Sequence, residues 1–374
     1  GCRGNVMMRK FALVFGTRPE AIKLAPVAKI LSTIPTISYL GVNTGQHTNL
    51  MPSIMERFGI TTSYHLNLMV AGQTLIELET SLLETMTQIF GIEHPDAVIV
   101  QGDTATAVAT ALSAFHCGIP VGHVEAGLRT YLPETPFPEE TFRRIIATFS
   151  HWNFAPSDHA ATNLMGERVP GKIFVTGNPV VDALTAIVRW APNGSSAWPK
   201  QGKQHRIVAT IHRRENHPYL PQIFTALSTL AQNPDIELFL PLHPNPVVVE
   251  AAHEFLARSQ VKIIDPMEYD SWIGFLNTAD LVISDSGGLQ EEAPILGIPL
   301  LIAREETERP EVVSGGYGYL VGHNRDRIIV AAMQSLNGHL RYARGSPYGD
   351  GHAAERIVYH LLREYDLSAP DVSY

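Results

Sequence analysis

Short apolar segments alternate with helix-like segments along almost the whole chain, and this alternation restricts the fold more than any other feature. Strands of a parallel sheet are continuously apolar, because helices cover the sheet on both faces. The sequence therefore predicts an α/β fold with parallel sheets. The predicted strands are Phe11–Phe15, Leu40–Thr44, Ala97–Gln101, Pro120–Val124, Trp152–Ala155, Ile173–Val175, Ile207–Ile211, Glu237–Leu240, Val261–Ile264, Leu281–Ser284 and Pro299–Ile302. The clearest predicted helices are Ala21–Leu31, Leu75–Phe90 and Thr106–Phe115.

The alternation stops once, in a polar, turn-rich stretch at Pro192–Gly202. With 374 residues the chain is also long for a single core. We therefore expect two αβ domains in series, over residues 8–182 and 183–351, with a cleft between them. In such sheets ligands bind beyond the carboxyl ends of the strands, so residues that directly follow strands are the candidates for function.

Composition excludes several classes of protein. A net charge of −9 argues against a general binder of nucleic acid or of anionic membranes. The two cysteines, Cys2 and Cys117, cannot form a disulfide framework or a cysteine zinc cluster, and they favour a reducing, cytoplasmic location. No apolar run approaches the ~18 residues of a membrane span. The dinucleotide fingerprint, the P-loop and the zinc-protease motif are missing, so we expect neither a cofactor nor a metal.

Charged residues follow three predicted strands of the first half. Arg18 and Lys23 come after the first strand and could bind an anion. The alternative is a tight turn whose charged side chains are only solvated. Asp103 follows the strand at Ala97–Gln101 and could instead be a helix N-cap. Glu125 ends the strand at Pro120–Val124, and Glu139 opens a helix. Asp103, Glu125 and Glu139 can converge at one sheet edge, where crowded carboxylates suit acid/base chemistry.

Glu139 and Arg143 are four residues apart, so they share one face of the predicted helix. A surface ion pair explains this spacing without any function.

The second half shows two comparable groups. His212 follows a strand and can donate to a phosphate or leaving group, although a packed histidine is the alternative. Ser286, Gly287 and Gly288 lead from a strand into a helix, where backbone amides bind phosphate. Glu292 can accept hydrogen bonds from ribose hydroxyls, and Arg309 can add positive charge. A plain glycine-containing helix start is the alternative reading.

Several segments, in this order, give the chain a strong resemblance to the non-hydrolysing UDP-N-acetylglucosamine 2-epimerases, from about Phe11 to Leu362. These segments are Phe15–Lys23, Thr44–His47, Gln101–Thr104, His123–Thr130, Pro136–Glu140, His212–Glu215, Asp285–Pro294, Thr307–Glu311 and Pro347–Gly351.

The resemblance implies a GT-B-like architecture, with two Rossmann-like domains facing across a cleft, usually in a homodimer. It implies that a final helix near 352–365 packs back on the first domain. The implied reaction interconverts UDP-N-acetylglucosamine and UDP-N-acetylmannosamine by elimination and re-addition of UDP through a glycal, without a cofactor. The products of the family feed cell-envelope polysaccharides. The alternatives are an enzyme that hydrolyses the glycal, an epimerase of a modified UDP-hexosamine and a glycosyltransferase. A non-catalytic UDP-sugar sensor is a further alternative.

The resemblance also implies roles for particular residues. The implied catalytic residues are Asp103, Glu125, Glu139, Lys23 and His212. The implied substrate-binding residues are Arg18, Arg143, Met267, Trp272, Ser286, Gly287, Gly288, Glu292 and Arg309. The residues matching a second, activating substrate site are Gln46, His47, Gln73, Glu140, Arg214 and His243. The chain departs from the family pattern at Thr130–Pro136, at Phe142 and at Met267, which can alter the preferred sugar substituents.

Overall fold

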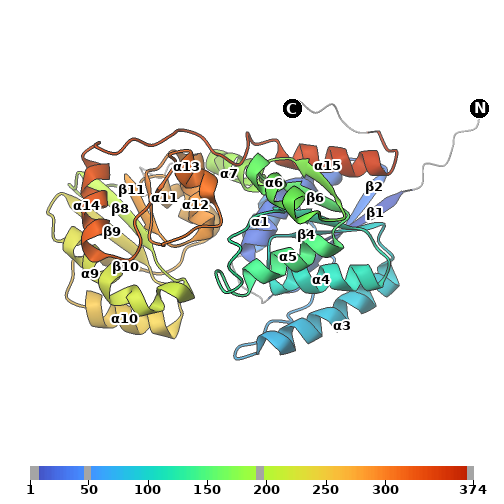
Figure 1. The fold of residues 1–374 in the computed structure, drawn as a ribbon, viewed down its shortest axis with the longest axis horizontal. Helices are drawn as coiled ribbons and strands as arrows, with labels where there is room; N and C mark the ends of the chain where they lie inside the picture. Colours follow the sequence, from blue (N-terminus) through green and yellow to red (C-terminus); the bar gives the residue numbers. More distant parts are fainter. Residues whose placement is uncertain (1–7, 46–51, 191–197, 369–374) are drawn as a thin grey trace, which may run out of the picture. The chain divides into compact units, whose positions relative to one another are not determined.

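A computed structural model describes residues 8–45, 52–190 and 198–368 of the chain, without the side chains of residues 52–54. The chain divides into two compact units (Figure 1). Unit 1 contains the residues up to Ala183 together with those from Tyr348 onwards, and unit 2 is Leu184–Pro347. Much of the linker predicted at Pro192–Gly202 lies outside the described residues.

Unit 1 is a parallel sheet of seven strands in the order β3-β2-β1-β4-β5-β6-β7. Its strands are β1 (Arg9–Phe15), β2 (Ile37–Asn43), β3 (Tyr64–His65), β4 (Ala97–Gln101), β5 (Val121–Val124), β6 (Trp152–Ala155) and β7 (Lys172–Val175). Its helices are α1 (Arg18–Leu31), α2 (Pro52–Arg57), α3 (Leu75–Glu93), α4 (Ala105–His116), α5 (Glu139–Phe149), α6 (Asp158–Glu167) and α15 (Ala353–Glu364), and α7 (Pro179–Trp190) begins in this unit.

Unit 2 is a parallel sheet of six strands in the order β10-β9-β8-β11-β12-β13. Its strands are β8 (His205–Thr210), β9 (Ile236–Pro241), β10 (Lys262–Ile264), β11 (Leu281–Ser284), β12 (Leu300–Ile302) and β13 (Tyr319–Leu320). Its helical segments are η1 (Arg214–Tyr219), α9 (Leu220–Ala231), α10 (Pro246–Leu256), α11 (Tyr269–Leu276), α12 (Gly287–Leu296), α13 (Pro310–Ser314) and α14 (Arg325–Leu336).

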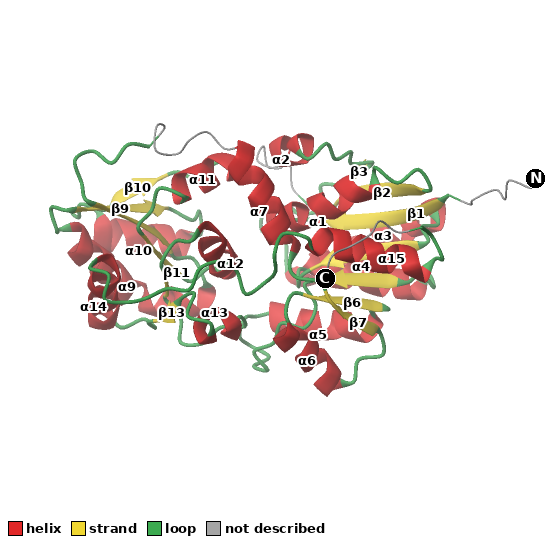
Figure 2. Cartoon of the chain, turned by 90° about the horizontal axis from the view of Figure 1, so that it is seen from above, coloured by secondary structure: helices red, strands yellow, loops and turns green. Residues whose placement is uncertain are grey.

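The prediction of two α/β units with parallel sheets is confirmed, and helices flank the strands in each unit (Figure 2). Every predicted strand is present, and its ends coincide with the observed ends or differ from them by at most three residues. The structure adds β3 and β13, two-residue strands at sheet edges that the sequence analysis missed.

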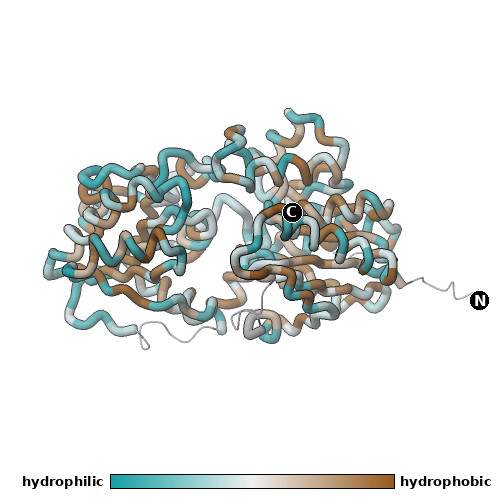
Figure 3. The backbone as a smooth tube through the Cα atoms, turned by 90° about the horizontal axis from the view of Figure 1, so that it is seen from below, coloured by the Kyte–Doolittle hydropathy of each residue, from teal (hydrophilic) through white to brown (hydrophobic). Residues whose placement is uncertain are grey.

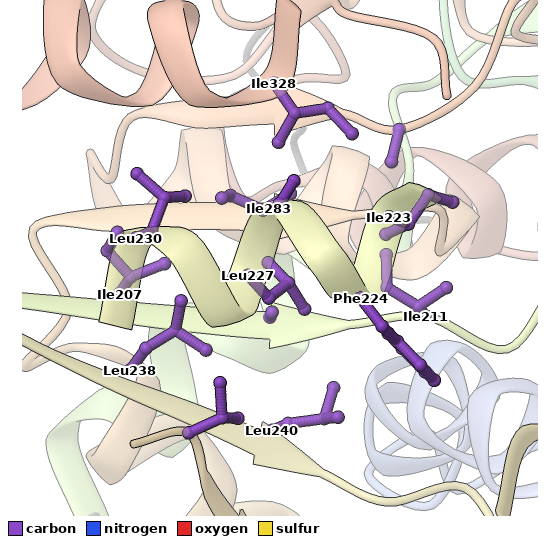
Figure 4. Packing of buried hydrophobic residues seen from close by; sticks show 14 of the residues in the cluster. Ile207, Ile211, Ile223, Phe224, Leu227, Leu230, Leu238, Leu240, Ile283 and Ile328 are labelled. Atoms are coloured by element: carbon purple, nitrogen blue, oxygen red, sulfur yellow. The ribbon is translucent and has the colours of Figure 1, made fainter. Parts of the chain in front are cut away.

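Burial of apolar side chains between the strands and their covering helices stabilises each unit. The strands are mostly hydrophobic, and the connecting loops carry more of the polar residues (Figure 3). In unit 2, Phe224 and Leu227 of α9 pack with Ile207, Leu238 and other buried residues of the neighbouring strands (Figure 4). Burying a side chain of this size contributes about 1.5–3 kcal/mol, so the sheet and its covering helix stabilise each other.

Each sheet reverses its strand order at one point, between β1 and β4 in unit 1 and between β8 and β11 in unit 2. Successive right-handed crossovers run in opposite directions from this point, so the loops at the carboxyl ends of the two central strands separate. A crevice for a ligand is expected there in each unit.

The C-terminal helix α15 packs against α1 within unit 1. Its first amides, of Ala353 and Ala354, donate to the carboxylate of Asp182 over 3.2 and 2.9 Å. Burial raises the pKa of Asp182 to about 6. None of the helices within the described ranges is long and apolar enough to cross a membrane.

Candidate active site

Glu125 lies directly after β5, at the carboxyl edge of the sheet of unit 1. Its side chain is buried, and its Oε2 atom accepts hydrogen bonds from Lys23 Nζ of α1 and from Asn178 Nδ2, the latter over 2.7 Å. Its φ of 66° lies in the left-handed region, which costs a residue with a side chain on the order of 1 kcal/mol. Backbone strain of this kind is concentrated at functional sites, and here it accompanies a buried ion pair.

Asp103 lies on the neighbouring loop, after β4, and pairs with Arg143 of α5. Thr104, not Asp103, is the N-cap of α4, with its hydroxyl oxygen accepting from the amide of Ala107 over 3.0 Å. The N-cap alternative for Asp103 is therefore wrong, and its carboxylate is held by an arginine instead.

Arg143 joins this loop to the start of α5. Besides Asp103 it pairs with Glu140, 3.3 Å away, and Glu140 in turn accepts from the amides of Thr130 and Tyr131 over 3.1 and 3.0 Å. The four-residue spacing of Glu139 and Arg143 did not predict these partners. Glu139 is the first residue of α5 and is partly buried. Asp103, Glu125 and Glu139 thus come from three connected segments at one edge of the sheet.

Glu20 connects the two loops at the switch point of unit 1. Its buried carboxylate accepts from the amides of Gly16 and Thr17 and from the hydroxyls of Thr17 and Thr104, over 2.7–3.0 Å. Burial raises its pKa. It holds the start of α1, which carries Arg18 and Lys23, next to the loop of Asp103. From the sequence alone, the position of Glu20 near the start of this helix indicates only that its charge complements the positive helix end.

In unit 2, Asp285 organises the switch point between β8 and β11. It follows β11, is fully buried, and accepts from the amides of His212 and Arg213 and from Nδ2 of Asn216, over 2.9–3.1 Å. The Nδ1 atom of His212 lies 3.5 Å from its Oδ1. Asp285 therefore fixes the loop that presents His212.

His212 is partly exposed, and its ring stacks on that of His243 with centroids 5.1 Å apart. Burial lowers the pKa of His212, although the charge of Asp285 opposes this shift. The imidazole is therefore neutral near pH 7, and a neutral ring can both donate and accept a hydrogen bond.

Gly287 and Gly288 open α12 directly after Ser286. A Cβ on Gly287 would lie 2.7 Å from Nη1 of Arg309, so a side chain there would displace the guanidinium from the backbone. Arg309 is buried and pairs with Glu291 and Glu308. In the described structure its guanidinium supports the helix start through these carboxylates.

The remaining substrate-binding candidates lie on neighbouring elements. Glu292 of α12 accepts from the hydroxyl of Tyr269 over 2.7 Å. Met267 lies in the loop after β10, and Trp272 lies in α11; both are partly buried. Arg18 is the first residue of α1 and is also partly buried.

The sequence profile of the family described as UDP-N-acetylglucosamine 2-epimerase matches residues 29–362. The chain belongs to this family. The UDP-N-acetylglucosamine 2-epimerase of Neisseria meningitidis is 39% identical over 369 residues, which are 95% of this chain and 99% of that protein.

Solved structures agree with this assignment. A crystal structure of UDP-GlcNAc 2-epimerase from Neisseria meningitidis bound to UDP-GlcNAc has a TM-score of 0.89 and 38% identity, covering 95% of this chain and all of that one. The Methanocaldococcus jannaschii enzyme, in complex with UDP-GlcNAc and UDP, has a TM-score of 0.84 and 34% identity, covering 95% and 99%. The expected GT-B-like fold class and the resemblance to this family of isomerases are confirmed.

The epimerase fold brings some predicted residues together within each unit. In unit 1 these are Lys23, Asp103, Glu125 and Arg143, and in unit 2 they are His212 with His243 and Gly287 with Arg309. Of the residues suggested for an activating site, Gln73 and Glu140 lie in unit 1, and Arg214 and His243 lie in unit 2. Gln73 bonds locally to Val70, and Arg214 is exposed at the start of η1. Gln46 and His47 lie outside the described residues.

Three residues that organise the site were not among the candidates: Asn178, Glu20 and Asp285. Asp285 was the easiest to find, because it directly follows a predicted strand. Within the ranges 8–45, 52–190 and 198–368, no group of three or more histidine, cysteine, aspartate or glutamate residues is arranged to hold a metal ion.

His123 gives the epimerase a testable pH dependence of stability. It is fully buried in β5, and its Nε2 donates to the carbonyl of Gly102 over 2.7 Å. Burial lowers its pKa from 6.5 to about 4. Between about pH 4 and pH 6.5, His123 is therefore protonated in the unfolded chain but neutral in the folded chain. The stability from this group is fully present above pH 6.5 and is lost as the pH falls toward 4, by roughly 3 kcal/mol.

His123→Gln keeps an amide donor for Gly102 but removes this titration. We expect its free energy of unfolding, from urea titrations at pH 7 and pH 4.5, to fall less on acidification than that of the unaltered protein. Equal losses for the two proteins would show that His123 does not cause the acid sensitivity.

Proposed function

We propose that the chain interconverts UDP-N-acetylglucosamine and UDP-N-acetylmannosamine by eliminating and re-adding UDP through a glycal. Family membership and the nucleotide sugars bound by similar structures support this substrate. The observation that carries the proposal is the buried Glu125, held by Lys23 and Asn178, on the loop next to that of Asp103.

The chemistry needs what this arrangement supplies. The hydrogen on sugar carbon 2 is barely acidic, because no carbonyl is attached to that carbon. As the bond from carbon 1 to the UDP oxygen breaks, UDP takes the electron pair, positive charge grows at carbon 1, and a carboxylate removes the carbon 2 proton. Return of a proton to the opposite face, with re-addition of UDP to carbon 1, completes the inversion. Acid/base groups at the sugar and positive charge at the diphosphate suffice, so no cofactor is required.

We assign the acid/base steps to Asp103, Glu125 and Glu139, without dividing the steps among them. Lys23 and Arg143 lie beside these carboxylates and supply positive charge. Arg18, at the first turn of α1, would add a contact to the leaving diphosphate.

The nucleotide is assigned to unit 2. The amides of Ser286, Gly287 and Gly288 at the start of α12, together with His212, would bind the diphosphate. Glu292 would hold the ribose, and Met267 and Trp272 would lie near the uracil. Arg309 would then act partly through Gly287, since its guanidinium already lies against that residue. The first functional domain would contain residues 8–182 together with the helix at 352–365. The second would contain residues 183–351.

An isotope experiment tests the reaction. The chain is incubated with UDP-N-acetylglucosamine in deuterated water, and the products are followed by NMR. We expect the manno isomer and deuterium at carbon 2 of both isomers, with little free UDP. Free N-acetylmannosamine with stoichiometric UDP would identify a hydrolysing enzyme, and no deuterium at carbon 2 would refute the proposal.

We also propose a cytoplasmic homodimer. Large apolar side chains of three helices in unit 1 are exposed: Ile76 and Ile92 of α3, Phe115 of α4 and Ile145 of α5. A second copy would cover them. Sedimentation equilibrium that gives the monomer mass at micromolar concentration would contradict this assembly.

A further inference from the structure

Asn178 connects the candidate catalytic carboxylate to the segments through which the chain leaves and re-enters unit 1. It is 1% exposed, and its side-chain and backbone polar groups form hydrogen bonds. Its Nδ2 donates to Glu125 Oε2 over 2.7 Å, its Oδ1 accepts from the amide of Val180 over 3.1 Å, and its own amide donates to the carbonyl of Tyr348 over 2.7 Å.

Asn178 and Lys23 bind the same oxygen of Glu125 from different elements. Lys23 approaches from α1 and Asn178 from the loop after β7, and both donate to Oε2. Two donors on one oxygen restrict rotation of the carboxylate about its last bond. The side chain of Glu125 also starts from a strained backbone with φ of 66°, so its direction depends on such partners.

The loop that carries Asn178 contacts the segment at Tyr348, where the chain returns to unit 1. The chain leaves unit 1 after Ala183 and returns to it at Tyr348, which is buried. Gly177 packs against this return segment, since a Cβ there would lie 3.1 Å from the carbonyl of Tyr348. The amide of Asn178 is thus anchored to the returning chain, while its side chain reaches Glu125.

We propose that Asn178 is a positioning residue that orients the Glu125 carboxylate for proton transfer and couples this orientation to the return segment at Tyr348. The inference rests on the proposed function, because it assigns Glu125 a part in the epimerisation. Asn178 does not itself need to touch the sugar.

The charge state of residue 178 matters for this role. Glu125 already has the cation of Lys23 beside it, and the charges of Glu125 and Asp103 both act on His123. His123 is uncharged near neutral pH, because burial lowers its pKa to about 4. A neutral amide at position 178 therefore adds a donor without adding charge.

Asn178→Asp tests the positioning of Glu125 separately from the structural hydrogen bonds of residue 178. The aspartate keeps an oxygen that caps the amide of Val180 and keeps the backbone bond to Tyr348, but it replaces the donor to Glu125 by a second carboxylate. Two carboxylates in contact cannot both ionise easily, so the pair would share a proton to higher pH. We expect kcat to fall by about 100-fold, with the acidic limb of the kcat profile shifted upward by about one pH unit.

Asn178→Ser is the second variant, because serine also caps helices but is too short to reach Glu125. We expect kcat to fall about tenfold with KM changed by less than about threefold. Asn324→Asp is the matched control, since Asn324 caps α14 in unit 2 through the amide of Arg327. It should leave kcat and its pH profile unchanged.

The unaltered chain and all three variants are assayed for epimerisation between pH 5 and pH 9, with melting temperatures measured in parallel. The inference is overturned if Asn178→Asp keeps kcat within about twofold, or if activity falls only with the folded fraction and the pH profile does not move. An unaltered chain without epimerase activity would instead refute the proposed function.

Discussion

Glu125→Gln is expected to lose epimerisation by about 10³-fold, because an amide can neither take nor give the proton at sugar carbon 2. The substitution conserves shape, and a glutamine oxygen can still accept from Lys23 and Asn178, so the unit should remain folded. UDP should bind with unchanged affinity, since we assign the nucleotide to unit 2. Steady-state kinetics measures the first expectation, and calorimetric titration with UDP measures the second.

Two further variants make this test specific. Asp158→Asn removes an equal charge from an exposed position of the same unit, at the start of α6, and should leave turnover unchanged. Asp103→Asn should lose epimerisation as Glu125→Gln does, although it also weakens the pair with Arg143. Unimpaired turnover in both Glu125→Gln and Asp103→Asn would remove these carboxylates from the mechanism.

Much of the fold could be predicted because its strands are continuously apolar. Ala97–Gln101 and Leu281–Ser284 are buried throughout, and their predicted and observed ends coincide. The edge strands β3 and β13 could not be predicted, because two residues form no periodic pattern. Their pairing depends on the neighbouring strand, which local sequence does not reveal.

The residues of the candidate site could be predicted where they directly follow a strand. Asp103, Glu125 and the glycines at Gly287 and Gly288 were found by that rule, and the resemblance added their roles. Asn178 was missed because its importance lies in a contact with Glu125, 53 residues away in the sequence. Glu20 was read by its local position, whereas its bond to Thr104 spans 84 residues. Long-range hydrogen bonds of this kind leave no periodic signal.

Asp285→Ala is expected to destabilise unit 2 by about 3 kcal/mol, because it leaves buried donors without an acceptor. Those donors are the amides of His212 and Arg213 and Nδ2 of Asn216, and the last of these residues is fully buried. Urea unfolding measures the loss. Tryptophan fluorescence can follow it, since Trp198 and Trp272 report on unit 2 and Trp152 on unit 1.

The same variant should weaken UDP binding, by about tenfold, because the loop that presents His212 loses its anchor at the switch point. Asp235→Ala, at an exposed position of unit 2, is the control and should change neither quantity. If Asp285→Ala unfolds and binds UDP like the control, the carboxylate does not organise this loop. If stability falls while UDP affinity is kept, Asp285 supports the unit but not its nucleotide site, and the diphosphate must then depend on the amides of α12 rather than on His212.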